Sequence, residues 1–242
     1  MNTQIEMPDK YREFLLQKAA EVTPGPYYPE HFLKKLKTHL GCIPMLTPFL
    51  NQDKNDRRNL IVAVVGDSIT AGHFEQKRPF GQSAGISDYR ELLEYFFIDI
   101  DAVYHEQLRK MLWKEYPLTP VSMVNFGAAG DTIEGVEERL EREVLSIKPD
   151  LVILNASMNF SIHHGSAKDY ERHFRHVVEM IQQETELILV TPNMAEKTET
   201  DAALAERVEV IRKLSEEKKI PLADAYRTWE ELFATYPEAK VE

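Results

Sequence analysis

The sequence predicts an α/β protein with a mostly parallel sheet of five strands that is covered by helices on both faces. Short aliphatic runs alternate with longer segments in which apolar residues recur at helical spacing. This alternation implies right-handed crossover connections between parallel strands. Strands that are buried on both faces are apolar throughout, and the runs have that character rather than an alternating one.

Five runs are predicted to be the strands, and the first of them is the strongest because it is wholly aliphatic. In chain order they are Leu60–Val65, Val121–Asn125, Leu151–Leu154, Leu187–Val190 and the weaker Ile220–Ala223. Ligands of parallel α/β sheets bind beyond the carboxyl ends of the strands. We therefore expect the chemistry in the loops that follow residues 65, 125 and 154.

Helical patterns fill the segments between these runs. Apolar residues recur every three or four positions in 132–147 and 168–183, and residues 199–217 are rich in strong helix formers. Residues 88–115 are predicted to hold one or two more helices. Each helix follows a predicted strand, as the crossover connections require.

Residues 1–58 are predicted to form an N-terminal helical arm that packs on a main domain spanning residues 59–242. An amphipathic helix is expected over residues 5–20, and a second, short helix over residues 30–41. Three prolines, at positions 24, 26 and 29, separate the two.

The charge and the cysteine content narrow the classes of partner and compartment. The net charge is −11, and such a surface repels phosphate backbones and anionic lipid, so neither nucleic acid nor a membrane is an expected partner. The plainer interpretation is that the acidic surface keeps the protein soluble. Cys42 is the one cysteine, which is typical of a reducing compartment. Residues 1–20 contain no apolar stretch of signal-peptide type, so we expect a cytoplasmic protein.

The first loop places a serine directly after the strongest strand. Residues 66–72 read Gly-Asp-Ser-Ile-Thr-Ala-Gly, so Gly66 permits a sharp turn and the hydroxyl of Ser68 is exposed at the sheet edge. A serine becomes a nucleophile when a neighbouring base takes its proton. The alternative is an ordinary turn in which Asp67 and Ser68 cap a helix. The motifs of the α/β-hydrolase elbow and of the P-loop are both absent here.

The second and third loops offer hydrogen-bond donors. In the second, Gly130 precedes a helix, and a free backbone N–H at that position suits developing negative charge. In the third, Asn159 carries a side-chain amide that can donate to an oxyanion. The alternatives are a plain helix cap at the second loop and a turn-stabilising Asn at the third.

Taken together and in order, the three loops resemble the sequence blocks of SGNH (GDSL-type) hydrolases. The first block matches at residues 66–68 (Gly-Asp-Ser), the second at 130–132 (Gly-Asp-Thr) and the third in part at 157–160 (Ser-Met-Asn-Phe). The similarity covers about residues 58–235. It implies a flavodoxin-like, three-layer α/β/α sandwich and a serine esterase that needs no metal and no organic cofactor.

The resemblance also implies the roles of particular residues. Ser68 is the expected nucleophile, and the oxyanion is expected to lie among the backbone N–H groups of Ser68 and Gly130 and the amide of Asn159. Asp67, His73 and His163 are further candidates for contacts with a small-molecule ester, such as an acetylated sugar, a lipid or an acyl thioester.

Two departures from the family pattern bear on activity. Ser157 and Phe160 replace the usual Gly and Asp of the third block, although Asn159 is kept. No D-x-x-H block follows His176, and the nearest match at residues 224–227 ends in Arg. We therefore expect the histidine and aspartate of the triad to lie outside this chain, which would then be C-terminally incomplete and inactive for want of a base. His163 and His164 are the alternative source of a base.

Two other hypotheses about the function of a protein with this fold stay open. One is a non-catalytic binding module that has kept the oxyanion hole and lost the base, and the other is a nucleotide- or flavin-binding protein of the same topology. Labelling of Ser68 by an active-site probe separates the enzyme from both. The sequence gives no indication of the oligomeric state.

Overall fold

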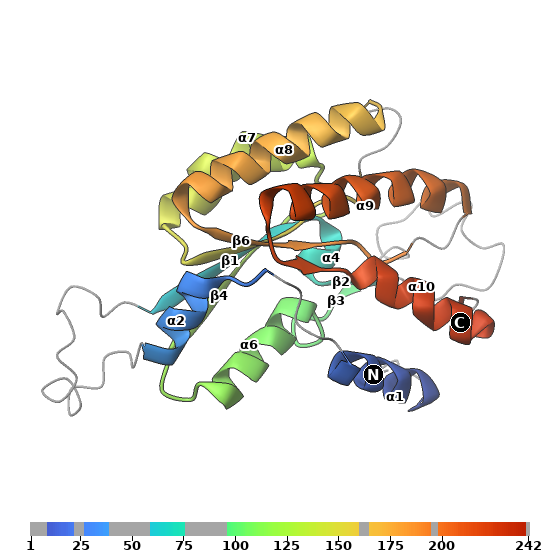
Figure 1. The fold of residues 1–242 in the computed structure, drawn as a ribbon, viewed down its shortest axis with the longest axis horizontal. Helices are drawn as coiled ribbons and strands as arrows, with labels where there is room; N and C mark the ends of the chain where they lie inside the picture. Colours follow the sequence, from blue (N-terminus) through green and yellow to red (C-terminus); the bar gives the residue numbers. More distant parts are fainter. Residues whose placement is uncertain are drawn as a thin grey trace, which may run out of the picture.

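The computed structural model describes residues 9–21, 27–38, 59–75, 96–159, 165–194 and 198–240. A sheet runs through its centre (Figure 1). The sheet has five strands in the order β4-β1-β5-β6-β7, with parallel pairing throughout. The strands are β1 (Leu60–Gly66), β4 (Val121–Gly127), β5 (Leu151–Asn155), β6 (Glu186–Val190) and β7 (Leu222–Ala223). Counted along the chain, this order is 2-1-3-4-5, the flavodoxin-like arrangement. The predicted fold class and all five predicted strands are confirmed.

Helices α7 (Ile133–Arg139), α8 (Ala167–Glu184) and α9 (Thr198–Lys218) pack with one face of the sheet in a single large core. Every second residue of β1 and β5, such as Val65 and Leu154, points into this core. Helix α8 buries Phe174 and Ile181 against them, as its predicted period requires. A capping box, in which Ser166 and Asp169 bond reciprocally, fixes where α8 begins.

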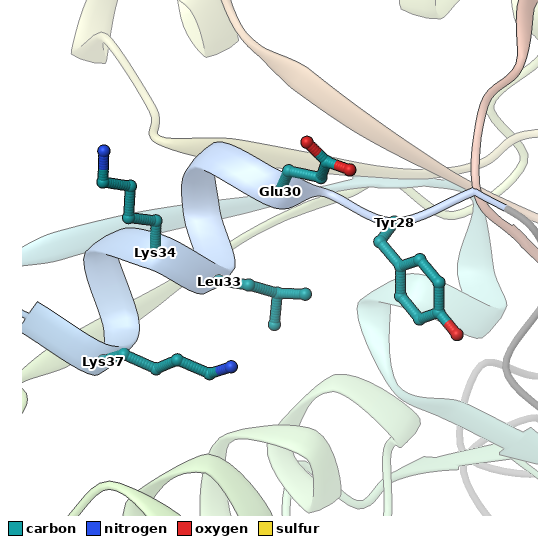
Figure 2. Close-up of a pocket in the computed structure, with 5 residues that line it drawn as sticks. All are labelled: Tyr28, Glu30, Leu33, Lys34 and Lys37. Carbon is teal, nitrogen blue, oxygen red and sulfur yellow. The ribbon is translucent and has the colours of Figure 1, made fainter.

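The opposite face is covered by α2 (Glu30–Thr38) and α6 (Tyr104–Glu115), which lie on the other side of the sheet from α7 and α8 (Figure 1). Phe32 and Leu36 of α2 are buried against the alternate side chains of β1 and β5. Figure 2 shows a pocket beside α2 that is lined by Tyr28, Glu30, Leu33, Lys34 and Lys37. At the first residue of β6, the carboxylate of Glu186 accepts hydrogen bonds from the backbone N–H groups of His31 (3.1 Å) and Phe32 (2.6 Å). A carboxylate at a helix N-terminus is stabilising, so Glu186 fixes α2 to the sheet.

Helix α1 (Asp9–Glu21) packs on α10 (Ala225–Thr235) at the C-terminal end of the described chain. The rings of Tyr11 and Phe14 meet the ring of Tyr236 edge-on, with centroids 5.4 and 5.8 Å apart. Lys10 pairs with Glu238 at 2.6 Å. Both helices of the predicted arm therefore contact the main domain, while its boundary at residue 58 lies outside the described residues and stays a prediction.

The structure departs from the predicted elements in two places. The helix expected over 132–147 is α7 followed by a π-helical turn (Leu140–Val144) and a 3-10 turn (Leu145–Ile147). A small antiparallel pair, β2 (His73–Glu75) and β3 (Phe96–Ile98), was not predicted, because each strand has only three residues. No helix within the described ranges is both long enough and apolar enough to cross a membrane.

Candidate active site

Ser68 is the first residue of α4 (Ser68–Ala71), a single turn that follows β1. Asp67 caps this turn by accepting a hydrogen bond from the backbone N–H of Ile69 at 3.0 Å, and Gly72 ends it with a left-handed φ of 90°. Among the described residues, neither the hydroxyl nor the backbone N–H of Ser68 has a hydrogen-bond partner. Both groups are therefore available to a ligand.

Two glycines allow the ends of the strands to approach α4 closely. A Cβ on Gly66 would lie 2.2 Å from the carbonyl oxygen of Asn155 and 2.3 Å from Oγ1 of Thr70. A Cβ on Gly127, at the end of β4, would lie 2.2 Å from the backbone nitrogen of Ala71. Any larger residue at either position would push the strand ends away from the turn that carries Ser68.

The three loops that the sequence singled out are joined in a closed ring, with one hydrogen bond between each pair of loops. The bonds run from Ala128 N to Gly66 O (3.0 Å), from Asn159 Nδ2 to Asp131 O (3.0 Å) and from Met158 N to Asp67 Oδ2 (3.3 Å). The predicted site residues Ser68, Gly130 and Asn159 each lie next to a member of this ring. The structure therefore brings the three loops to one edge of the sheet.

Two donors of the second and third loops remain free to act. The amide of Asn159 has two hydrogens, and the bond to Asp131 uses one of them. Gly130 has a left-handed φ of 78°, and no atom of the described chain lies within 4 Å of where its Cβ would be. The backbone N–H of Gly130 likewise has no partner among the described residues. The conformation, rather than crowding, favours glycine here.

Asp67 holds two of the loops together and does not face solvent. Its side chain is fully buried, and its two oxygens accept from the backbone N–H groups of Ile69 and Met158. Burial raises the pKa of this carboxyl, those two hydrogen bonds oppose the shift, and the nearby charge of Asp131 adds to it. Both oxygens of Asp67 thus accept hydrogen bonds from the protein, and the substrate contact expected of Asp67 from the sequence stays a prediction.

A partly buried arginine that the sequence analysis did not single out lies beside the second loop. Arg139, at the end of α7, donates from Nε to Asp131 Oδ2 (2.8 Å) and from Nη2 to the carbonyl oxygen of Phe126 (2.7 Å), near the end of β4. A longer contact of 3.5 Å reaches the carbonyl oxygen of Gly66. The side chains of Arg139 and Asp131 are each 14% exposed. The signal available in the sequence was a cation on the second turn after the Gly-Asp-Thr block.

The histidines do not supply a base to Ser68 within the described chain. His73 lies in β2 with its side chain half-buried, and His163 lies outside the described residues. His105 is buried, and its Nε2 pairs with the carbonyl oxygen of Thr70 at 3.0 Å, so it holds α4 rather than the nucleophile. His173 and His176 of α8 both bond to Glu137 of α7. No histidine of the described ranges hydrogen-bonds the hydroxyl of Ser68.

Asp224, the acidic residue after the last strand, makes contacts that stabilise the fold. Its carboxylate caps α10 by accepting from Arg227 N (3.1 Å), accepts from Oγ1 of Thr191 (3.0 Å) and pairs with Arg212 at 2.8 Å. Burial acts to raise its pKa, but the hydrogen bonds and the charge of Arg212 outweigh it, so the pKa lies below the usual value.

In the described chain, no cluster of three or more His, Cys, Asp or Glu side chains is arranged to hold a metal ion.

Fold and site together define a hydrolase of the flavodoxin-like α/β class, with a serine at the carboxyl edge of its sheet. A model of the GDSL-like lipase/acylhydrolase family matches residues 64–240. The chain therefore belongs to this family, and the resemblance drawn from the sequence is confirmed. No curated protein matches the chain.

Solved structures with the same fold include three named hydrolases. Axe2, an acetylxylan esterase from Geobacillus stearothermophilus, is 22% identical with a TM-score of 0.56, over 74% of this chain and 83% of that one. A lipase/acylhydrolase from Enterococcus faecalis is 24% identical (TM-score 0.55; 74% and 80%). LAE5, an α/β hydrolase enzyme from the metagenome of Lake Arreo, Spain, is 20% identical (TM-score 0.56; 75% and 85%). At such identities the likeness shows the fold alone.

Proposed function

We propose that this protein hydrolyses a carboxylic ester with an acetyl or other short acyl group, through an acyl-enzyme formed on Ser68. The observation that carries this proposal is the ring of hydrogen bonds that joins the three loops. It leaves the hydroxyl of Ser68 unbonded at the same edge as the free donors of Gly130 and Asn159. Membership of an acylhydrolase family supports ester chemistry at this site.

The reaction has two steps. In the first, Oγ of Ser68 attacks the ester carbonyl carbon while a base takes the hydroxyl proton, and the negative charge that develops on the carbonyl oxygen is held by the three donors. The bond to the alkoxy group then breaks, and the alcohol leaves with the proton. In the second step, water attacks the acyl-enzyme and releases the carboxylic acid and the free hydroxyl of Ser68.

We assign the role of base to a histidine that is oriented by an aspartate, as the family resemblance implies. A histidine has an ordinary pKa of about 6.5, so it is neutral and able to accept the proton of Ser68 at pH 7. Without a base the hydroxyl stays protonated, and the oxyanion donors alone would give about 10³-fold acceleration over water. His163 and His164 are the histidines of the undescribed segment after the third block.

For the substrate, we propose a small acetyl ester, with acetylated sugars as the first class to test. Axe2 is described as an acetylxylan esterase, which makes this class a reasonable starting point for a chain of the same fold. The net charge of −11 disfavours anionic esters such as phospholipids. We place the reaction in the cytoplasm, because a single thiol suits a reducing compartment.

Labelling with a fluorophosphonate probe tests this function, because the probe reacts with a serine that has both a base and an oxyanion hole. The intact native protein is compared with the variant Ser68→Ala. Labelling that is lost in the variant supports the esterase. If the intact protein shows no labelling at all, a binding module that lacks the base becomes the better assignment.

A further inference from the structure

A pair of oppositely charged side chains, those of Asp131 and Arg139, lies beside the proposed oxyanion donors. Asp131 belongs to the loop before α7, and Arg139 lies at the far end of α7, eight residues later. Both side chains are mostly shielded from solvent. Bringing a guanidinium into such a place is costly unless its hydrogen bonds are well satisfied, so the pair is expected to serve a purpose other than surface solubility.

The guanidinium connects the second loop to the strand end behind it. Nε binds the carboxylate of Asp131, and Nη2 binds the carbonyl oxygen of Phe126, one residue before the end of β4. The other oxygen of the carboxylate accepts from the backbone N–H of Thr132 at 3.0 Å. The backbone around Asp131 is therefore held in place by hydrogen bonds to the side chain of Asp131 as well as by hydrogen bonds to the backbone itself.

This peptide is the one that orients the site. Its carbonyl oxygen accepts the hydrogen bond from Asn159 Nδ2, and Gly130 precedes it directly. A shift of Asp131 would turn the amide of Asn159 directly, because that amide binds its carbonyl oxygen. The N–H of Gly130 belongs to the Ala129–Gly130 peptide, so the shift would reach it only through the backbone of the loop. Two of the three proposed oxyanion donors are thus linked to Asp131, one by a hydrogen bond and one by the chain, and Arg139 fixes that residue.

The local helix geometry makes room for the pair. A Cβ on Gly135 would lie 2.0 Å from Oδ1 of Asp131, so only glycine leaves space for the carboxylate in the first turn of α7. Directly after Arg139 the helix widens into the π-helical turn Leu140–Val144. Turns of this kind are rare and occur frequently at functional sites.

We propose that Arg139 is a positioning residue for the oxyanion hole, which holds the peptide at Asp131 so that Asn159 and Gly130 face Ser68. This rests on the function proposed above. Arginine suits the role because its planar fork binds a carboxylate and a carbonyl at the same time, whereas the single ammonium of lysine cannot keep both in one geometry.

The test uses the intact native protein and the substitutions Arg139→Gln and Arg139→Lys, with Arg142→Gln as the matched control. Arg142 is 76% exposed, lies three residues further along and shares the partner Glu143 with Arg139. Hydrolysis of p-nitrophenyl acetate gives kcat and KM. We expect Arg139→Gln to lower kcat by about 10- to 100-fold, as expected for misplaced oxyanion donors, with KM changed less than about threefold. Arg139→Lys should recover part of kcat, and Arg142→Gln should match the native protein.

A second substitution approaches the pair from its other side. Gly135→Ala leaves Arg139 intact and replaces a glycine within a helix, which by itself favours folding. Because its methyl group would displace the carboxylate of Asp131, it should lower kcat by a factor similar to that of Arg139→Gln. Thermal unfolding of each variant shows whether the protein measured is folded.

The outcomes separate the two proposals. If the native protein is neither labelled at Ser68 nor active, the esterase function itself fails. If the native protein is active, and folded Arg139→Gln and Gly135→Ala keep its kcat, the positioning role is wrong.

A further test combines Arg139→Gln and Asn159→Ala in one double variant. Since the arginine acts through the peptide that binds Asn159, the double variant should be less impaired than the product of the two single effects, and a full product would overturn the proposal.

Discussion

The side-chain amide of Asn159 donates to the backbone carbonyl of Asp131 at 3.0 Å, which joins the third loop of the site to the second. The bond fixes the direction of the second amide hydrogen, which is the one left for a ligand. In this way a side chain from the loop after β5 is oriented by a backbone group that precedes α7. If these groups are the oxyanion donors, as proposed, this one is oriented before any substrate binds, which is what electrostatic stabilisation of a transition state requires.

Asn159→Ala removes one oxyanion donor and should lower kcat for p-nitrophenyl acetate by about 100- to 1000-fold, with little change in KM. Asn159→Asp is nearly the same size but places a carboxylate beside the developing negative charge, so it should be at least as impaired. Steady-state kinetics of both variants, together with the rate of fluorophosphonate labelling, provides the measurement. An Asn159→Ala variant with native kcat would remove Asn159 from the proposed oxyanion hole.

Asp67→Ala should destabilise the fold and weaken the site together. The substitution leaves the partly buried N–H groups of Ile69 and Met158 without their acceptor, at a cost of up to about 1–3 kcal/mol for each. The midpoint of urea unfolding measures the loss, and the rate of Ser68 labelling measures the effect on the site. Asp101→Ala is the control, since its side chain is 91% exposed and its one ion pair among the described residues is with Lys110 at the surface.

Asp67 also predicts a direction for the pH dependence. Burial raises its pKa, so the folded state binds the proton more tightly than the unfolded state does. The stability contributed by this group is therefore complete below the ordinary pKa of 3.8 and is lost as the pH rises through the higher folded pKa. In Asp67→Asn this decline should be absent. An unchanged pH dependence of the unfolding free energy in that variant would show that Asp67 is not the group responsible.

How much of this structure can be predicted from the sequence depends on how far apart along the chain the interacting residues lie. The sheet follows from local patterns, because wholly aliphatic runs such as Leu60–Val65 and Leu151–Leu154 can be satisfied only by burial on both faces. The three loops follow from their position at strand ends. Arg139 could not be foreseen, since its value depends on a carbonyl of β4 and a carboxylate that only the folded chain brings within reach of one guanidinium.

The same limit applies to the packing of α2. The periodicity of residues 30–41 predicts a short helix but not the surface on which it packs. That surface is set by Glu186, 155 residues away from His31, whose carboxylate receives the first N–H groups of α2. Pairings over such separations leave no local trace in one sequence.

Glu186→Ala should therefore loosen α2 without unfolding the sheet. Two backbone N–H groups at the start of α2 lose a charged acceptor, for which the expected cost is about 1.5–3 kcal/mol per hydrogen bond at most. Limited proteolysis followed by mass spectrometry should detect faster cleavage between residues 27 and 38. Glu184→Ala, a substitution at the last residue of α8 just before β6, is the control and should leave the cleavage rate unchanged. Equal cleavage of the native and Glu186→Ala proteins would contradict the assigned contact.

Asp224→Asn should make the protein less stable at neutral pH and less sensitive to acid. The carboxylate caps α10 and pairs with Arg212 in a site where the two side chains are only 16% and 20% exposed. Its pKa is lowered in the folded state, so its contribution is complete above the ordinary pKa of 3.8 and is lost as the pH falls through the folded value. Removing the charge leaves Arg212 without its main partner, at a cost of about 2–4 kcal/mol at pH 7. Urea unfolding at pH 7 and at pH 3 tests this, and the difference in stability between Asp224→Asn and the native protein should shrink at the lower pH. A difference that is equal at both values would mean that the ionised carboxylate does not stabilise the fold.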